Sequence, residues 1–194
     1  MAYQPQKFDN LLGTSGFSDI LLKNHFTLYE GYVKNVNLMM LELESLVKNG
    51  KAGTPAHSEI QRRFGWEWNG MRLHELYFGN MSKKNSALQS DAKLLGEITR
   101  IYGSLENWEK DFKAVGGMRG IGWAILYEDS HSKELFNVWV NEHDMGHLAG
   151  CRPLLVLDIF EHAYTLDYGI KKADYIEAFL KAINWQAVEE RMAK

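Results

Sequence analysis

The most constraining feature of this sequence is a long helical pattern near its start, from Phe17 to about Val47. Apolar residues recur along it at helical intervals, and no proline interrupts it. The segment KNGKAGTP then breaks the pattern, and a second helix is expected from about Ala56 to Asn80, although Gly65 and Gly70 weaken its middle. Two long helices joined by a short break predict an N-terminal helical hairpin.

The second half of the chain changes character after the polar connector MSKKNSA, residues 81–87. Helices are expected over 89–102 and 104–115, the later one capped by Ser104. Strands are expected over 123–129, 134–142 and 153–158, and helical segments over 173–183 and 185–192. The pattern predicts an α+β fold: a hairpin domain over residues 1–84, then a domain of helices around a small three-stranded antiparallel sheet over 85–194.

Composition and charge exclude several classes of protein. With 194 residues, a net charge of −3 and a pI near 6.2, the chain has no general footprint for nucleic acid. Cys151 is the only cysteine, so neither an internal disulfide nor a Cys-based zinc site is expected. No apolar run reaches membrane-spanning length, and the first ten residues do not resemble a secretory signal, so we expect a cytoplasmic protein without membrane contact.

The residues best suited to chemistry are histidines and one aspartate. His25 and His74 lie on the two predicted helices, and Asp158 and His162 stand four residues apart after an apolar run. Three imidazoles and one carboxylate suit iron or manganese, and the four-residue spacing fits either one helical face or a strand end leading into a turn. The competing interpretation is that His25 and His74 are core residues with ordinary hydrogen bonds.

Other plans for a metal site fit the sequence less well. HELYF lacks the second histidine of a zinc-protease helix, and the only Glu-x-x-His, Glu128 to His131, falls in a predicted turn. His143 and His147, in the Gly-rich stretch NEHDMGHLAG, form a candidate ligand pair, but that stretch reads as a loop. His147 is therefore assigned no role.

The stretch LDIFEHAYTLDY, residues 157–168, is close to the D-x-W-E-H-A-Y-x-x-D-Y signature of iron/manganese superoxide dismutases. The resemblance extends over nearly the whole chain and follows the order of the family's motifs. Its other parts are GYVKNVN at 31–37, WNGMRLHELYF at 68–78, GIGWAIL at 120–126 and INWQAVEER at 183–191.

This resemblance implies a set of site residues. The metal ligands would be His25, His74, Asp158 and His162, with a solvent molecule as the fifth. Tyr32 matches the family's gateway tyrosine. His143 stands where the family holds that solvent with a glutamine or histidine, opposite a Gly70 that leaves room for it. Glu161 matches a glutamate that bonds a ligand histidine of the partner subunit.

The chain departs from the family at the entrance to the site. The His25–Tyr32 interval is one residue shorter than usual, which implies either the loss of a helical bulge or a different first ligand. Tyr29 replaces the gateway histidine, and Thr165 replaces a tyrosine that normally meets it across the dimer interface. The two replacements are interpreted as compensating for each other.

The implied activity is disproportionation of superoxide to O2 and H2O2 at one iron or manganese ion per subunit, in a homodimer or a dimer of dimers. Two alternatives remain open, because a fold does not fix a function. One is a non-catalytic structural relative, such as an assembly component. The other is a different metal-dependent redox or binding protein on the same scaffold.

Overall fold

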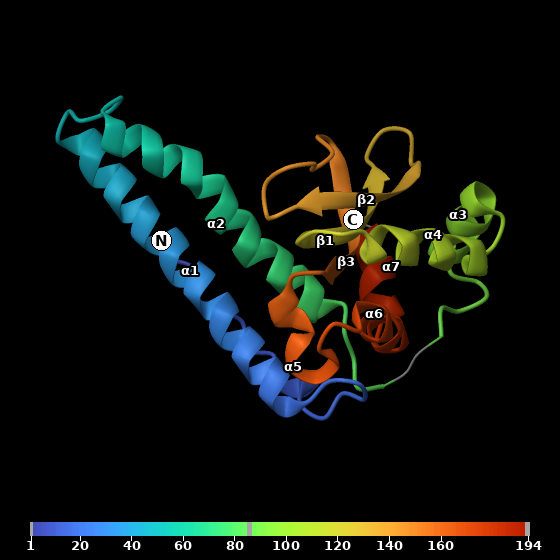
Figure 1. Ribbon diagram of the computed structural model, residues 1–194. Coiled ribbons are helices and arrows are strands. Elements are labelled where there is room, and N and C mark those ends of the chain that lie inside the picture. The colour runs from blue at the N-terminus through green and yellow to red at the C-terminus, as the bar shows by residue number, and fades with distance from the viewer. Residues whose placement is uncertain (1, 85–86, 193–194) are drawn as a thin grey trace.

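The computed structural model describes residues 2–84 and 87–192 and begins with the predicted hairpin. After a short 3-10 turn η1 (Asp9–Leu11), helix α1 (Asp19–Lys48) and helix α2 (Pro55–Gly79) extend to one side of the molecule (Figure 1). The hydroxyl of Ser18 caps α1 by accepting from the Leu21 N–H, and Thr54 caps α2 in the same way. The predicted hairpin is confirmed, with both helices starting and ending within two residues of the expected bounds.

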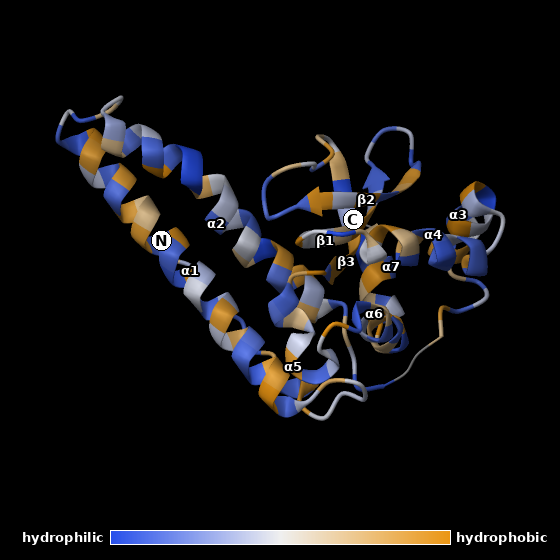
Figure 2. Cartoon of the chain, viewed as in Figure 1, coloured by the Kyte–Doolittle hydropathy of each residue, from blue (hydrophilic) through white to orange (hydrophobic). Residues whose placement is uncertain are grey.

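The burial of the hairpin is uneven along its length. On α1 the buried side chains fall mostly before Asn37, and on α2 they fall from Glu67 onward. Apolar residues nevertheless recur along α1 into its C-terminal half (Figure 2). One of them, Leu41, is 64% exposed. The halves of the two helices nearer the sheet therefore belong to the core, while the distal halves carry apolar groups at the surface.

A three-stranded antiparallel sheet follows, in the order β2-β1-β3. Its strands are β1 (Gly122–Asp129), β2 (Leu135–Asn141) and β3 (Cys151–Asp158). Gly122 opens β1 with a φ of 136°, and a Cβ there would lie 2.0 Å from the Val140 carbonyl oxygen, so only glycine fits. The register then places Trp123 opposite Asp158, at the end of the sheet nearest α2.

Helices complete the second half of the molecule, as Figure 1 shows. Helices α3 (Lys93–Tyr102) and α4 (Leu105–Gly117) precede the sheet, and α6 (Lys172–Lys181) and α7 (Trp185–Met192) end the chain. Ser104 caps α4 as predicted. The expected start of α3 at residue 89 is wrong, because the Ala92 N–H bonds to the Gln89 carbonyl in a turn and Ala92 itself is extended.

The α+β class and the antiparallel sheet are confirmed. Two short elements that the sequence did not predict follow β3, the 3-10 turn η2 (Glu161–Ala163) and helix α5 (Thr165–Tyr168). The predicted domain boundary after residue 84 touches positions outside the described residues and stays a prediction. Within the described part of the chain, no helix is both long and apolar enough to cross a membrane.

Candidate metal centre

Four elements from three separate parts of the sequence each supply one of the predicted ligands. His25 comes from α1, His74 from α2, Asp158 from the last position of β3, and His162 from η2. Three of the four residues are buried, and His162 is partly exposed. Asp158 and His162 lie on a strand end and the turn after it rather than on one helical face, which resolves the two options left by their spacing.

The ligand atoms of these residues converge around one carboxylate oxygen. Asp158 Oδ2 lies 3.1 Å from His25 Nε2, 3.2 Å from His162 Nε2 and 3.5 Å from His74 Nε2. All four ligand atoms lie within 4.8 Å of one another. Such separations are those of neighbouring donors around one ion that is about 2 Å from each.

Hydrogen bonds hold two of these ligands in a binding orientation. His74 Nδ1 lies 2.5 Å from the Gly70 carbonyl and donates to it, so Nε2 carries the lone pair. That Nε2 is buried without a hydrogen-bond partner. Asp158 Oδ1 accepts from the Phe160 N–H at 2.8 Å, which leaves Oδ2 facing the histidines. An orphaned imidazole nitrogen beside a fixed carboxylate fits a bound cation.

The electrostatics prepare the four residues for that role. Burial lowers the pKa of His25 and lowers the pKa of His74 still further, so both rings are neutral and able to coordinate. Burial opposes ionisation of Asp158, but the His162 and His25 side chains outweigh it and hold the pKa of that carboxyl below its usual range. The donor set is thus one carboxylate, the neutral imidazoles of His25 and His74, and the His162 ring, which suits iron or manganese.

A chain of hydrogen bonds adjoins this cluster. Trp123 Nε1 donates to His143 Nδ1 at 3.0 Å, and His143 Nε2 lies 2.8 Å from the Tyr32 hydroxyl. Because indole N–H is only a donor, Nδ1 is the acceptor and the neutral ring donates from Nε2 to Tyr32. Burial lowers the pKa of His143 to about 4 and raises the pKa of Tyr32, so both groups are uncharged near neutral pH.

Tyr32 reaches the cluster from α1 despite its shortened distance from His25. Their seven-residue interval spans about two turns of a regular α-helix, so both side chains leave α1 on the same face. The Tyr32 ring stacks on His74 with centroids 5.2 Å apart. The residue that α1 contributes to the cluster is therefore His25, as the sequence indicated.

The space beside Gly70 has a different occupant from the one expected. A Cβ at Gly70 would meet three Tyr32 ring atoms first, the nearest at 2.6 Å. The missing side chain therefore makes room for Tyr32, and His143 packs instead against Trp66 and Phe160, with ring centroids at 4.4 and 4.7 Å.

Tyr29 and Thr165, which were predicted to meet across a subunit interface, have different partners within this chain. Tyr29 is fully buried, and its hydroxyl donates to Glu75 Oε1 and accepts from the Gln6 N–H. Thr165 is exposed and donates to the Glu161 carbonyl at 2.8 Å. The compensating exchange of Tyr29 and Thr165 across an interface stays a prediction.

Sequence reasoning missed a second layer around His143. His147, which was assigned no role, lies 2.9 Å from the His143 carbonyl through Nε2 and 2.7 Å from the Tyr127 hydroxyl through Nδ1. Tyr175 likewise supports Asp158 by donating to its carbonyl at 2.6 Å. The only signal for His147 was its four-residue spacing from His143, which suggested a ligand pair instead.

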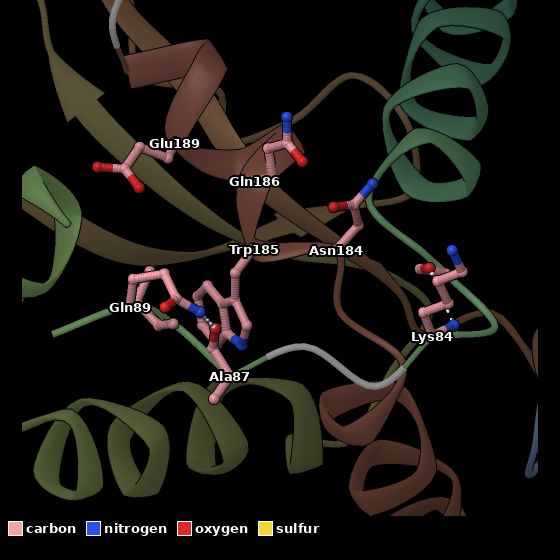
Figure 3. A pocket seen from close by; sticks show the side chains of 9 residues that line it. Lys84, Ala87, Gln89, Asn184, Trp185, Gln186 and Glu189 are labelled. Atoms are coloured by element: carbon pink, nitrogen blue, oxygen red, sulfur yellow. Dashed lines mark hydrogen bonds between the residues drawn. The ribbon is translucent and has the colours of Figure 1, made fainter. Parts of the chain in front are cut away.

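A surface pocket elsewhere in the molecule contains none of the four clustered residues. Figure 3 shows Trp185 beside Ala87 and Gln89 in a pocket between the connector and the start of α7. Its carboxylate, Glu189, already accepts from the Lys93 N–H at 2.7 Å. The metal cluster therefore remains the candidate site.

Comparison with known proteins agrees with this geometry. The family model for the C-terminal domain of iron/manganese superoxide dismutases matches residues 89–191. The chain belongs to the iron/manganese superoxide dismutase family. Its buried His25, His74, Asp158 and His162 cluster matches the metal site of that family.

Relatives of both metal types are similar to this chain over most of its length. The manganese superoxide dismutase 2 of Haloferax volcanii is 36% identical over 86% of this chain and 81% of its own. The iron superoxide dismutase of Cupriavidus metallidurans is 36% identical over 92% of this chain and 90% of its own. The iron superoxide dismutase of Saccharolobus solfataricus is 33% identical over 91% and 85%.

Proposed function

We propose that this chain is a superoxide dismutase that converts two superoxide anions and two protons into O2 and H2O2. The observation that carries the proposal is the convergence of four buried ligand atoms beside the Trp123–His143–Tyr32 hydrogen-bond chain. When bound, one iron or manganese ion supplies the redox chemistry by alternating between its +3 and +2 states. His25, His74, Asp158 and His162 would hold it.

The ligand residues would set the balance between the two oxidation states. The ionised Asp158 carboxylate favours the higher charge, while the neutral imidazoles keep the lower charge accessible. The Asp158 carboxylate is fixed by the Phe160 N–H and the His74 ring by the Gly70 carbonyl. These bonds orient the donors before a cation arrives and hold them during turnover.

The residues beside the ligands would manage protons. His143 donates from Nε2 to the Tyr32 oxygen, which leaves the Tyr32 O–H free to donate toward the site. The lowered pKa of His143 and the raised pKa of Tyr32 keep both groups in the states that this arrangement requires. Tyr32 and His143 are therefore proposed as the catalytic residues outside the ligand set.

Elemental analysis combined with turnover tests the proposal. Purified protein should contain up to one iron or manganese ion per chain, and superoxide turnover should scale with that metal content. Separate iron-loaded and manganese-loaded samples identify which metal supports the activity. Protein that binds no metal at this site would favour the structural relative, and metal-loaded protein without superoxide turnover would favour another redox or binding role.

We also propose that the chain works as a homodimer or a dimer of dimers. Glu161 is exposed and its side chain makes no hydrogen bond within the described residues, while the adjoining His162 side chain is 30% exposed. Exposed apolar residues lie nearby on elements joined by the Ser18–Asp167 hydrogen bond: Ile20, Leu166 and Ile170. A second copy would cover both features. The cytoplasm remains the proposed location.

A further inference from the structure

His147 connects the central strand of the sheet to the backbone that carries His143. Its Nδ1 lies 2.7 Å from the hydroxyl of Tyr127 on β1, and its Nε2 lies 2.9 Å from the His143 carbonyl oxygen. Tyr127 is buried, so one end of this connection is anchored in the core. The other end is the backbone carbonyl of His143, the residue whose imidazole is proposed to take part in proton transfer.

The chemistry of the three groups fixes the direction of both hydrogen bonds. A carbonyl only accepts, so His147 Nε2 carries the proton and donates it to His143. In the neutral ring Nδ1 is then the acceptor, and the Tyr127 hydroxyl donates to it. The result repeats the pattern of Trp123 and His143, in which a donor on β1 fixes one ring nitrogen and the other nitrogen points onward.

Within the described residues, few other hydrogen bonds hold the backbone of the turn that carries His143. Asn141 and Met145 exchange backbone hydrogen bonds at 2.8 and 3.3 Å, which closes the turn at its base. Glu142 inside the turn has a φ of 48°, in the left-handed region that non-glycine residues seldom adopt. Among the hydrogen bonds of the described residues, the one from His147 is the only bond to the His143 carbonyl.

We propose that His147 is a positioning residue for His143. Its bond to the His143 carbonyl holds the backbone of the turn in place relative to the sheet. The His143 imidazole is thereby kept aligned between Trp123 and Tyr32. Tyr127 in turn fixes the orientation of the His147 ring. The effect of His147 on catalysis rests on the proposed function. Its effect on the position of the His143 ring does not, and can be tested on the metal-free chain.

The alignment is measured directly by the indole N–H resonance of Trp123, recorded by NMR on metal-free protein and assigned with Trp123→Phe. In His147→Ala this resonance should move toward its position in His143→Ala, where the acceptor is missing. His147→Gln, whose amide can still donate to the carbonyl, should restore much of the shift. His131→Ala, at an exposed turn between β1 and β2, is the control and should leave the resonance unmoved.

Tyr127→Phe provides a second variant that leaves the His147 donor in place. It should shift the Trp123 resonance in the same direction as His147→Ala but by a smaller amount. If His147→Ala does not fold, Tyr127→Phe takes its place in the test. An unmoved Trp123 resonance in folded His147→Ala, or in Tyr127→Phe when the alanine variant does not fold, would overturn the positioning role.

Turnover measurements separate this proposal from the proposed activity. Because a misplacement of about 1 Å can cost 10²-fold in rate, we expect metal-loaded His147→Ala to turn over superoxide roughly tenfold more slowly. In a His143→Ala background the same change should have little further effect. If His147→Ala shifts the Trp123 resonance but the metal-loaded parent protein has no dismutase activity, the positioning role of His147 is supported and the proposed activity is rejected. Normal turnover in His147→Ala would reject the positioning role alone.

Discussion

His143 shows how one side chain acquires its state from its neighbours. The Trp123 indole gives Nδ1 a donor, so the neutral ring must carry its own proton on Nε2, where Tyr32 accepts it. Burial lowers the pKa of His143 to about 4, which removes the positive form of the ring near neutral pH. Tautomer, charge and orientation are therefore all determined by the packing.

Replacing His143 by alanine should reduce turnover while sparing metal binding. The change leaves all four ligands and their supporting bonds in place but removes the group that orients the Tyr32 hydroxyl. Turnover per bound metal should fall well over tenfold, a barrier change above about 1.4 kcal/mol. Stopped-flow superoxide decay and elemental analysis on the same sample measure both quantities. A small loss of turnover at full metal content would contradict the catalytic role of His143.

At this scale the sequence predicted identities better than contacts. His25, His74, Asp158 and His162 were found because their residue types and motif context carry the chemistry. The occupant of the space at Gly70 and the bond from His147 to His143 depend on how a helix and a loop approach each other. Such tertiary contacts leave no periodic pattern in the sequence.

The sheet determines where the loop and the ligands meet. Gly122 starts β1 at a φ of 136°, and its missing side chain lets the Val140 carbonyl come close. The next residue, Trp123, then faces Asp158 on β3 and reaches His143 beyond β2. One glycine thereby fixes the register on which two parts of the site depend.

Gly122→Ala should destabilise the protein through this strand. Left-handed backbone strain alone costs about 1–3 kcal/mol, and the overlap with Val140 adds to it. Gly96→Ala in α3 is the matched control, because nothing lies within 4 Å of a Cβ there and helical alanine should stabilise by about 0.4–1 kcal/mol. Urea denaturation of metal-free protein compares the two. Equal free energies of unfolding would show that Gly122 does not hold the register.

Elements were easier to predict than their surroundings. The hairpin followed from long helical patterns and the strands from short apolar runs, whereas η2 and α5 are too short to show either signal. Those two short elements nevertheless carry His162 and the residues after it. The part of the fold that completes the site was therefore the part with the weakest signal.

The metal cluster joins the two halves of the molecule, so proton binding and metal binding should act on global stability in opposite directions. The pKa of His143 falls to about 4 on folding, from about 6.5 unfolded, and burial also lowers the pKa of His25 and His74. The unfolded chain thus binds more protons over this range, and stability must fall as the pH falls.

Metal-free protein should therefore lose stability steadily between about pH 6.5 and pH 4. The urea midpoint measured at several pH values tests this, with His143→Gln as the control because it removes one titrating ring and should flatten the dependence. Adding iron or manganese should raise the midpoint at each pH above this range, because the metal binds the folded form. A midpoint that is constant across the range would contradict the prediction.

Assembly is the last property that belongs to the whole molecule, and Glu161 provides its test. If each Glu161 accepts a hydrogen bond from the partner's ligand histidine, it both joins the subunits and orients a metal donor. Glu161→Ala should then weaken the dimer and lower metal occupancy together, as measured by concentration-dependent sedimentation and elemental analysis. Glu106→Ala is the control, since among the described residues the Glu106 side chain pairs only with the exposed Lys110 on its own helix. A monomeric protein with full metal content and full turnover would rule out the shared role of Glu161, because the site would then be complete within one chain.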